Sequence, residues 1–439
     1  MDMIRARIQD AIKKNQQHFL QELNQIMEIP SVKGKAEVNA PFGIEPKKAL
    51  EKTLALAESY GFQTTMVKDA VGFAQYGNEQ EYIGVVGHLD VVPAGNGWDF
   101  PPFHLSEKDG RLFGRGILDN KGPAFACLYG LKLLKELDIP LDKTIRIIFG
   151  TDEESGSADL PLYLAKECPP TFGFTPDCKY PVVYGERGIV NIELTTPFSE
   201  IDLSVLGSIK GDQAKDHVPD ELSIELKNGH QVEVIGKRAP TNAPELGENA
   251  ITLLAKNLMS EVSLSESLKA YFKWMVDCLH EKHFGEGLNL ALADKDSGKL
   301  ILTPYELHKK ADGMSLSIAI RYPVTFQEEE ILARVKDVLL EDTQLAVIRS
   351  MKGTNFPKDD PNVLALADVY EEVTGLDGTP VTTTGATYAR TMPNIVAFGP
   401  SFPGQKGIAH NKNEYMDLKD LLLNLEIYTL ALYKLATEK

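Results

Sequence analysis

Residues Tyr82 to Gly122 organise the rest of the chain and read YIGVVGHLDVVPAGNGWDFPPFHLSEKDGRLFGRGILDNKG. They open with a short apolar run whose length and β-branched content are typical of a buried strand. His88-Leu89-Asp90 follows that run. Because alternate residues of a strand point to the same side, His88 and Asp90 are expected to project together. A neutral imidazole is a common zinc ligand, and a carboxylate two residues later could orient its other ring nitrogen.

Length and charge limit the classes of protein to consider. At 439 residues, of which 43% are hydrophobic, the chain is long enough for two domains with full cores. Its net charge of −17 disfavours nucleic acid as a partner, because the field of the protein repels phosphate. The N-terminal segment lacks the apolar core of a signal peptide, and no segment has the length of a membrane span. The four cysteines show no paired spacing, so we expect reduced thiols and a cytoplasmic protein. Because no segment is long enough to span a membrane, we expect no membrane contact.

The order of the expected elements predicts an interrupted α/β domain. Strands alternate with helices over residues 1–187, and the same pattern returns from residue 354 onward. This alternation indicates an α/β sheet whose ligands gather at the carboxyl ends of its strands. Residues 188–353 are richer in strand patterns and carry flanking helices, which is typical of a separate α+β domain. We therefore expect a domain formed by residues 1–187 and 354–439, into which residues 188–353 are inserted.

Five residues that could bind a metal stand at the ends of predicted strands or in loops. They are His88, Asp119 (delivered by a second apparent hairpin over residues 111–118), Glu154, Asp177 and His410. Two imidazoles and three carboxylates suit zinc or a similar divalent ion, and a bridging carboxylate would allow a pair of ions. Two adjacent ions could hold one water between them, lowering its pKa while polarising a carbonyl. Glu153, directly before Glu154, could take the proton of that water.

Each of these signals also has an ordinary structural explanation. Glu153-Glu154 could be the acidic first turn of a helix, and Asp119 could be a helix N-cap. Asp177 and His410 could be residues of a turn and of a loop. The residue pattern alone leaves both interpretations open, although the gathering of all five at strand ends favours a metal site.

Five segments decide between these interpretations by resemblance. In chain order they are GHLDVVPAGNGW, GRGILDNKGP, FGTDEESG, PDCKYP and AHNKNEY. Together they resemble the dinuclear-zinc metallopeptidase family that includes carboxypeptidase G-type enzymes, aminoacylases and succinyl-diaminopimelate desuccinylase. Within that family they are most similar to the PepV-type bacterial dipeptidases. The resemblance covers essentially the whole chain and implies a cytoplasmic hydrolase that cleaves the amide bond of dipeptides.

The resemblance implies a set of metal ligands. His88 and Asp177 would bind one Zn²⁺, Glu154 and His410 the other, and Asp119 would bridge the two. Mn²⁺ and Co²⁺ are the alternative ions. The nucleophile would then be a water that bridges the metals.

The resemblance also implies roles for residues beside the metals. Asp90 would steady His88, and Glu153 would act first as general base and then as general acid. A cis peptide is expected between Asp119 and Asn120. Asp is common at position 120 among the relatives, and Asn should still make local hydrogen bonds.

On this resemblance, residues 1–187 and 354–439 form a zinc-peptidase-like catalytic domain with a central mixed sheet, and residues 188–353 form the α+β lid. Arg321 in the lid and Arg390 in the catalytic domain would hold carboxylates of a dipeptide or short N-acyl amino acid. Relatives of this kind occur as monomers or as homodimers that pair through the lid, and both states stay open.

The lid departs from the family pattern at two positions. Pro240 stands where a histidine that stabilises the tetrahedral intermediate is expected, and Asp216 stands where an asparagine is expected. Loss of one oxyanion donor typically costs about 10²–10³ in rate. His217 would replace the missing histidine if the correspondence is shifted by one residue. The alternatives to an ordinary dipeptidase are therefore a catalytically impaired or re-specialised metal-binding homologue, and a deacylase of N-acyl amino acids.

Overall fold

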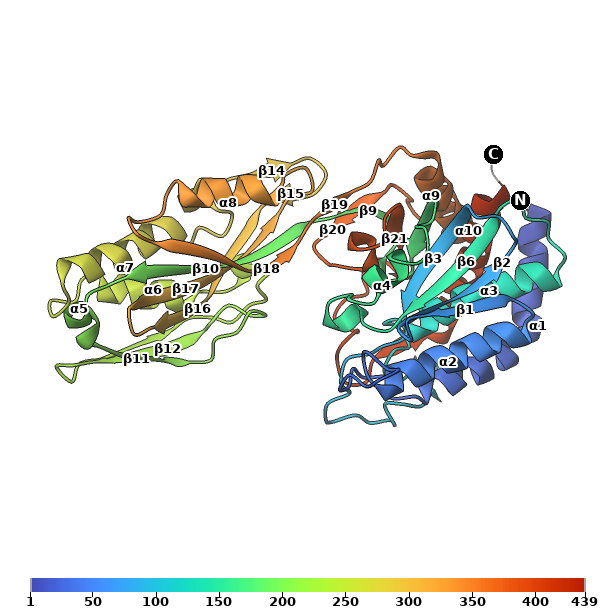
Figure 1. Ribbon diagram of the computed structural model, residues 1–439, viewed down its shortest axis with the longest axis horizontal. Coiled ribbons are helices and arrows are strands. Elements are labelled where there is room, and N and C mark those ends of the chain that lie inside the picture. Colours follow the sequence, from blue (N-terminus) through green and yellow to red (C-terminus); the bar gives the residue numbers. More distant parts are fainter. Residues whose placement is uncertain (1, 438–439) are drawn as a thin grey trace. The chain divides into compact units, whose positions relative to one another are not determined.

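The computed structural model describes residues 2–437, which divide into two compact units. The first unit contains the chain up to Tyr184, Phe356–Val381, and the chain from Gly385 onward; the second contains Gly185–Asn355 and Thr382–Thr384. Among the described residues, no helix is both long and apolar enough to cross a membrane. The predicted fold class, an α/β domain with a mixed central sheet interrupted by an α+β domain, is confirmed (Figure 1).

A mixed sheet forms the centre of the first unit. Its strand order is β1 (Gln63–Val67), β2 (Val71–Tyr76), β6 (Thr144–Gly150), β3 (Tyr82–His88), β7 (Phe172–Thr175), β21 (Ile395–Phe398) and β9 (Val182–Glu186). The last two residues of β9 belong to the second unit and pair there with β19 (Thr354–Asn355), and β20 (Val381–Thr383) also pairs with β9. Strand β3 pairs in parallel with β6 and β7, and β7 pairs in parallel with β21. The carboxyl ends of β3, β6 and β7 therefore meet at one edge of the sheet (Figure 1).

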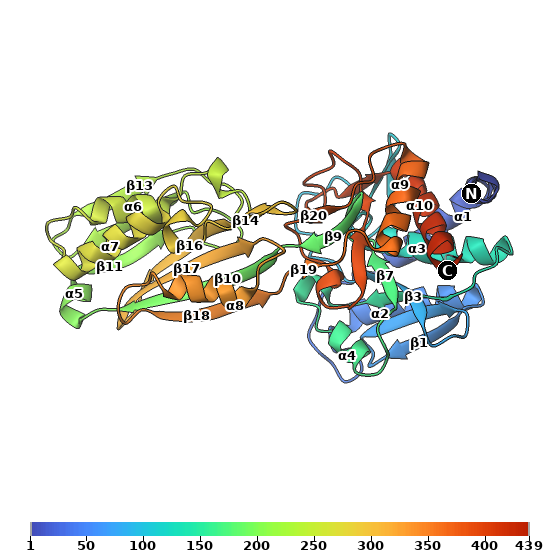
Figure 2. The same cartoon turned by 90° about the horizontal axis from the view of Figure 1, so that it is seen from above.

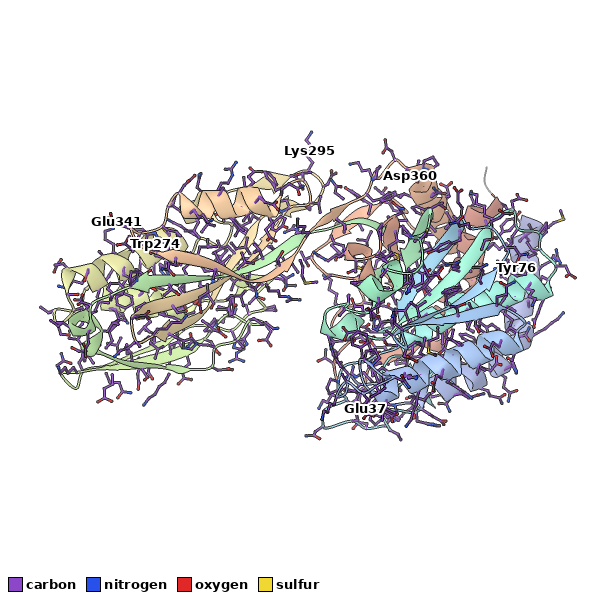
Figure 3. The ribbon with its side chains drawn as sticks, in the orientation of Figure 1. Glu37, Tyr76, Trp274, Lys295, Glu341 and Asp360 are labelled. Atoms are coloured by element: carbon purple, nitrogen blue, oxygen red, sulfur yellow. The ribbon has the colours of Figure 1, made fainter. Side chains whose placement is uncertain are left out.

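The sheet has buried side chains on both faces. Ile83 and Val85 of β3 belong to a core cluster shared with helices of the unit, whereas Tyr82 and Val86 belong to a second cluster. Because both faces are covered, β3 is fully buried and reads as a continuous apolar run, as predicted. The helices of the unit are α1 (Asp2–Met27), α2 (Ile44–Ser59), α3 (Lys121–Glu136), α4 (Leu160–Leu164), α9 (Pro361–Thr374) and α10 (Leu418–Thr437). Asp360 caps α9 by accepting a hydrogen bond from the backbone N–H of Asn362 at 2.8 Å (Figure 3).

Two small sheets complete the first unit. They are β23 (Tyr415–Asp417), β5 (Arg111–Phe113) and β4 (Ser106–Lys108), and β22 (Pro400–Ser401) with β8 (Cys178–Lys179). The hairpin predicted over residues 111–118 was wrong in its bounds, because β5 ends at Phe113 and pairs with β4. Beyond Phe113 the backbone leaves the strand, and several of its amides bond to Glu414.

The second unit is an α+β structure with two antiparallel sheets. One sheet has the order β16 (Ile301–Lys309), β17 (Gly313–Tyr322), β10 (Gly188–Pro197) and β18 (Gln344–Met351), the second has β11 (Leu206–Gly211), β12 (Glu221–Leu226) and β13 (Gln231–Ile235), and β14 (Ala293–Asp294) pairs with β15 (Gly298–Lys299). The helices are α5 (Glu200–Ser204), α6 (Ala250–Leu258), α7 (Glu266–Leu279) and α8 (Glu328–Lys336), of which α6 packs on α7 and on β12 and β13 (Figure 2). The indole N–H of Trp274 in α7 donates to the carbonyl of Val338 at 3.0 Å (Figure 3).

The buried carboxylate of Asp159 binds the backbone directly after strand β6. One oxygen of Asp159 accepts hydrogen bonds from the backbone N–H of Thr151 at 2.7 Å and from the Tyr388 hydroxyl at 2.5 Å. A Cβ on Gly150 would lie 1.9 Å from that hydroxyl, so the strand must end in glycine for Tyr388 to pack over it. The Tyr388 ring also meets His88 edge to face, with centroids 6.1 Å apart. The turn from Gly385 to Arg390 is thereby fixed beside the carboxyl end of β3.

Candidate metal centre

All five predicted ligands belong to the first unit, and the structure brings them together. His88 is the last residue of β3, Glu154 lies in the 3₁₀ turn η1 (Glu153–Ser155) after β6, and Asp177 follows β7. Asp119 lies in the loop before α3, and His410 lies in the loop between β22 and β23. The three parallel strands thus deliver three of the side chains to one edge of the sheet, where ligands of α/β proteins normally gather.

The Asp119 carboxylate lies between the two imidazoles. Its Oδ1 is 3.1 Å from Nε2 of His88, and its Oδ2 is 3.0 Å from Nε2 of His410. His88 Nε2 is also 3.5 Å from Asp177 Oδ2, and His410 Nε2 is 3.0 Å from Glu154 Oε2. The five side chains therefore form two groups that share Asp119, in the grouping that the resemblance implies.

The spacing of these atoms fits the coordination of divalent ions. Bonds of about 2.1 Å at a tetrahedral ion place neighbouring ligand atoms about 3.4 Å apart, and the four separations above run from 3.0 to 3.5 Å. Ligand atoms of His88, Asp119 and Glu154 lie within 4.8 Å of one another, as do those of His88, Glu153 and Asp177. Nitrogen and carboxylate donors of this kind suit zinc and related ions.

Electrostatics also favour a bound cation. Burial raises the pKa of Glu153 well above its usual range, and neighbouring carboxylates raise it further. Burial and the charge of Asp119 raise the pKa of Asp177 to about 6. Burial opposes a charge on His88, yet its hydrogen bonds with the surrounding aspartates raise its pKa well above the usual range. Such shifts arise where anions crowd together, and divalent ions would neutralise them.

Asp90 fixes two neighbouring parts of the centre. The nearest acceptor to Nδ1 of His88 is the backbone carbonyl of Asp90 at 2.9 Å, whereas the Asp90 carboxylate is 3.5 Å away. That carboxylate instead accepts hydrogen bonds from the backbone N–H groups of Glu153 at 3.2 Å and Glu154 at 3.1 Å. The sequence predicted contact between His88 and Asp90, but it gave no sign that the Asp90 carboxylate also holds the turn that carries Glu153 and Glu154.

Asn120 joins the loops around Asp119 and Asp177. The Asp119–Asn120 peptide is cis, which confirms the expectation. The Asn120 side chain accepts a hydrogen bond from the backbone N–H of His88 at 3.3 Å and donates to the carbonyl of Pro176 at 2.6 Å. Asn120 thus makes side-chain hydrogen bonds, but its partners here are distant in the sequence rather than local.

The two predicted substrate-binding arginines lie in different units. Arg390 ends a short 3₁₀ turn in the first unit, and its Nη2 donates to the carbonyl of Gly385 at 2.7 Å. Arg321 is in β17 of the second unit, and its Nη1 donates to the carbonyl of Thr384 at 2.9 Å.

The departures from the lid pattern lie next to one another in the second unit. His217 and Pro240 form an antiparallel bridge, and the backbone N–H of Val218 donates to the carbonyl of Ala239 at 2.8 Å. Nδ1 of His217 is 2.9 Å from a carboxylate oxygen of Asp216. His217 is thus the residue opposite Pro240 on the neighbouring segment.

Comparisons with known proteins identify similar chains. Residues 84–434 match the sequence profile described as "Peptidase family M20/M25/M40". The chain is 31% identical over 468 residues to the "Putative dipeptidase YtjP" of Bacillus subtilis, and the alignment covers 99% of each protein. It is 30% identical over 456 residues to the "Beta-Ala-Xaa dipeptidase" of Lactobacillus delbrueckii subsp. lactis, with 96% of each covered. The crystal structure of human carnosine dipeptidase 1 has the same fold, with a TM-score of 0.64 at 16% identity over 99% of each chain.

Metal binding at this centre should displace protons. Hydrogen bonds with Asp119 and Glu154 raise the pKa of His410 to about 11, so its ring carries a proton at neutral pH that a metal must displace. We therefore expect the affinity for Zn²⁺ to rise with pH, by about tenfold per unit for each proton displaced. Calorimetric titration of the metal-depleted protein in buffers of different ionisation enthalpy measures the Zn²⁺ affinity and the number of protons released.

A matched pair of variants locates the effect. His410→Gln should lower both Zn²⁺ affinity and proton release. His104→Gln removes a partly exposed histidine that pairs with Glu28, outside the centre, and should change neither. Equal Zn²⁺ affinity from pH 5.5 to 8, with no proton released, would contradict the assignment.

Proposed function

The chain belongs to peptidase family M20/M25/M40 and is a metallopeptidase, and we propose that it hydrolyses the amide bond of dipeptides. The observation that carries this proposal is the Asp119 carboxylate, which has one oxygen 3.1 Å from His88 and the other 3.0 Å from His410. The names of the two relatives at 30% and 31% identity support a dipeptide as the substrate. Localisation in the cytoplasm is part of the same proposal.

We assign five residues to two metal ions. His88 and Asp177 would hold one ion, Glu154 and His410 would hold the other, and Asp119 would bind both. Zn²⁺, or alternatively Mn²⁺ or Co²⁺, would supply Lewis acidity there, which lowers the pKa of a water nucleophile and polarises the carbonyl under attack. The separations of 3.0–3.5 Å among the ligand atoms support this grouping.

Glu153 is the proposed general base and then general acid. Its carboxylate has an oxygen within 4.8 Å of ligand atoms of His88 and Asp177. Asp90 fixes its backbone, so the side chain starts from a defined position. Burial raises the pKa of Glu153, and a raised pKa suits a group that takes a proton from water and then returns it to the leaving amine.

Arg390 and Arg321 are the proposed carboxylate-binding groups. A guanidinium can donate two parallel hydrogen bonds to a carboxylate, which gives both energy and orientation. The Arg390 side chain is bound to the carbonyl of Gly385 within its own turn, and Tyr388 of that turn packs beside His88. These contacts support Arg390 as the group that receives the terminal carboxylate of a dipeptide.

His217 is the proposed replacement for the missing lid histidine. It stands opposite Pro240 in an antiparallel bridge, so its imidazole comes from the position adjacent to the one that proline occupies. Its Nδ1 is 2.9 Å from Asp216 and its Nε2 is 3.5 Å from Asp212, and under the proposal Nε2 would instead donate to the developing oxyanion.

Substitution of Glu153 tests the mechanism. Glu153→Gln removes the proton acceptor at nearly constant volume, and we expect kcat for β-Ala-His and Ala-Ala to fall by about 10²–10⁴ while two metal ions stay bound. The adjacent variant Glu154→Gln is the matched control, because it removes a proposed ligand and should lose metal as well as activity. Metal content by mass spectrometry and dipeptide cleavage by amine release are measured together.

The same assay separates the alternatives. Wild-type protein that cleaves N-acyl amino acids but no dipeptide is a deacylase, and metal-loaded protein that cleaves neither is a re-specialised homologue. Undiminished cleavage by Glu153→Gln would reject Glu153 as the base.

The role of Arg390 is tested with a substrate that lacks the carboxylate. Arg390→Ala should lower kcat/KM for a dipeptide by about 10–100-fold, because the charge-assisted hydrogen bonds to its carboxylate are lost. For the same dipeptide with a C-terminal amide, the wild type and the variant should have similar values. An equal loss for both substrates would show that Arg390 supports the fold of its turn and does not bind the carboxylate.

A further inference from the structure

Glu414 is a buried carboxylate that lies four residues after His410. Its Oε1 accepts three hydrogen bonds from one short loop, and its Oε2 accepts a fourth from the guanidinium of Arg115. The donors to Oε1 are the backbone N–H groups of Gly116 at 3.1 Å, Leu118 at 2.9 Å and Asp119 at 3.2 Å. Nη1 of Arg115 is 2.7 Å from Oε2. Four donors of this loop thus bond to the carboxylate, three at one oxygen and one at the other.

The loop depends on Glu414 for its backbone hydrogen bonds. Residues 114–119 belong to no helix or strand, and their six amides have the following acceptors. Gly114 donates to the Glu414 carbonyl, Arg115 to Pro102 and Ile117 to Gly114, while the remaining three donate to the Glu414 carboxylate. Four of the six amides therefore bond to Glu414. Without this acceptor the loop could not keep its backbone conformation, because its buried N–H groups need hydrogen-bond partners.

Arg115 compensates the buried charge of Glu414. Its side chain is 1% exposed, and its guanidinium lies over the Trp98 ring at 5.2 Å from the centroid. A buried carboxylate that lost its cation would be strongly destabilising, so Arg115 and Glu414 depend on each other. This ion pair connects the loop that carries Asp119 with the loop that carries His410.

The His410 loop itself has a constrained backbone. His410 and Asn413 both have left-handed φ values, +62° and +56°. The Asn413 side chain accepts a hydrogen bond from the backbone N–H of Asp99 at 2.8 Å and donates to its carboxylate at 2.7 Å. Glu414 follows directly, so its anchoring sets where this strained loop ends.

We infer that Glu414 is a positioning residue for the metal centre: by binding the amide of Asp119 from the loop of His410, it fixes the shared carboxylate relative to the second imidazole. The inference rests on the proposed function, in which Asp119 and His410 are ligands. Glu414 is itself no ligand here, because its two oxygens are occupied by the amides and the guanidinium.

The variant Glu414→Gln tests the inference. A glutamine has only one oxygen for the four donors, and its NH₂ group faces either Arg115 or the amides as a donor against a donor. We expect the affinity of the metal-depleted full chain for Zn²⁺ to fall by about 10–100-fold, as for other residues that orient ligands. Calorimetric titration with Zn²⁺, and competition with a chelator, measure it.

Glu426→Gln is the matched control. Glu426 is also a buried glutamate of the first unit that pairs with an arginine at 2.7 Å, here Arg5, and it lies on α10 rather than beside a ligand. Both variants should lower the melting temperature of the metal-free protein, whereas only Glu414→Gln should lower Zn²⁺ affinity. A folded Glu414→Gln protein with wild-type affinity for Zn²⁺ overturns the inference.

Amide hydrogen exchange in the wild type judges the inference even if Glu414→Gln does not fold. The amides of Gly116, Leu118 and Asp119 should be protected in metal-free protein, because their acceptor, Glu414, is in place without the metal. Exchange at the rate of an open loop overturns the inference. Wild-type protein that binds no Zn²⁺ but protects these amides would refute the proposed function while leaving the Glu414 hydrogen bonds intact.

Discussion

The shared carboxylate of Asp119 imposes the constraint on which the rest of the site depends. One carboxylate can serve two imidazoles only if both rings approach within about 3 Å, and these rings come from residues more than 300 positions apart. His88 is set by a fully buried central strand, so its position follows from the core. His410 comes from a loop, so its position must be set by specific hydrogen bonds.

Buried carboxylates accept hydrogen bonds from the backbone at three places around the site. Asp90 accepts from the amides of the turn that carries Glu153 and Glu154. Asp159 accepts from the amides that follow β6. Glu414 accepts from the loop of Asp119. None of these three acids is a proposed ligand, but each binds the backbone close to a proposed ligand. Hydrogen bonds to a charged acceptor are among the stronger ones in proteins.

The strands of the first unit could be predicted from the sequence because their pattern is simple. Strand β3 has both faces covered, so it reads as a nearly continuous apolar run, and β6 is apolar from Ile147 to Phe149. The five candidate ligands could be proposed because each stands after such a run or in a segment that resembles a known family, and the structure brings all five together.

The residues that hold the ligands could not be predicted in the same way. Glu414 meets residues 116–119 across almost 300 positions, and a lone glutamate in a loop carries no periodic signal of such a contact. The same contact explains why the hairpin expected up to residue 118 ends at Phe113. Likewise, nothing in the sequence distinguishes the carbonyl of Asp90 from its carboxylate as the nearer acceptor for His88.

The most direct test of the account is a crystal structure of the zinc-loaded protein with anomalous scattering measured at the zinc edge. We expect two zinc peaks about 3.5–4 Å apart, with one oxygen of Asp119 on each ion, His88 on the first and His410 on the second. A single zinc ion, or an Asp119 carboxylate that binds neither ion, would contradict it.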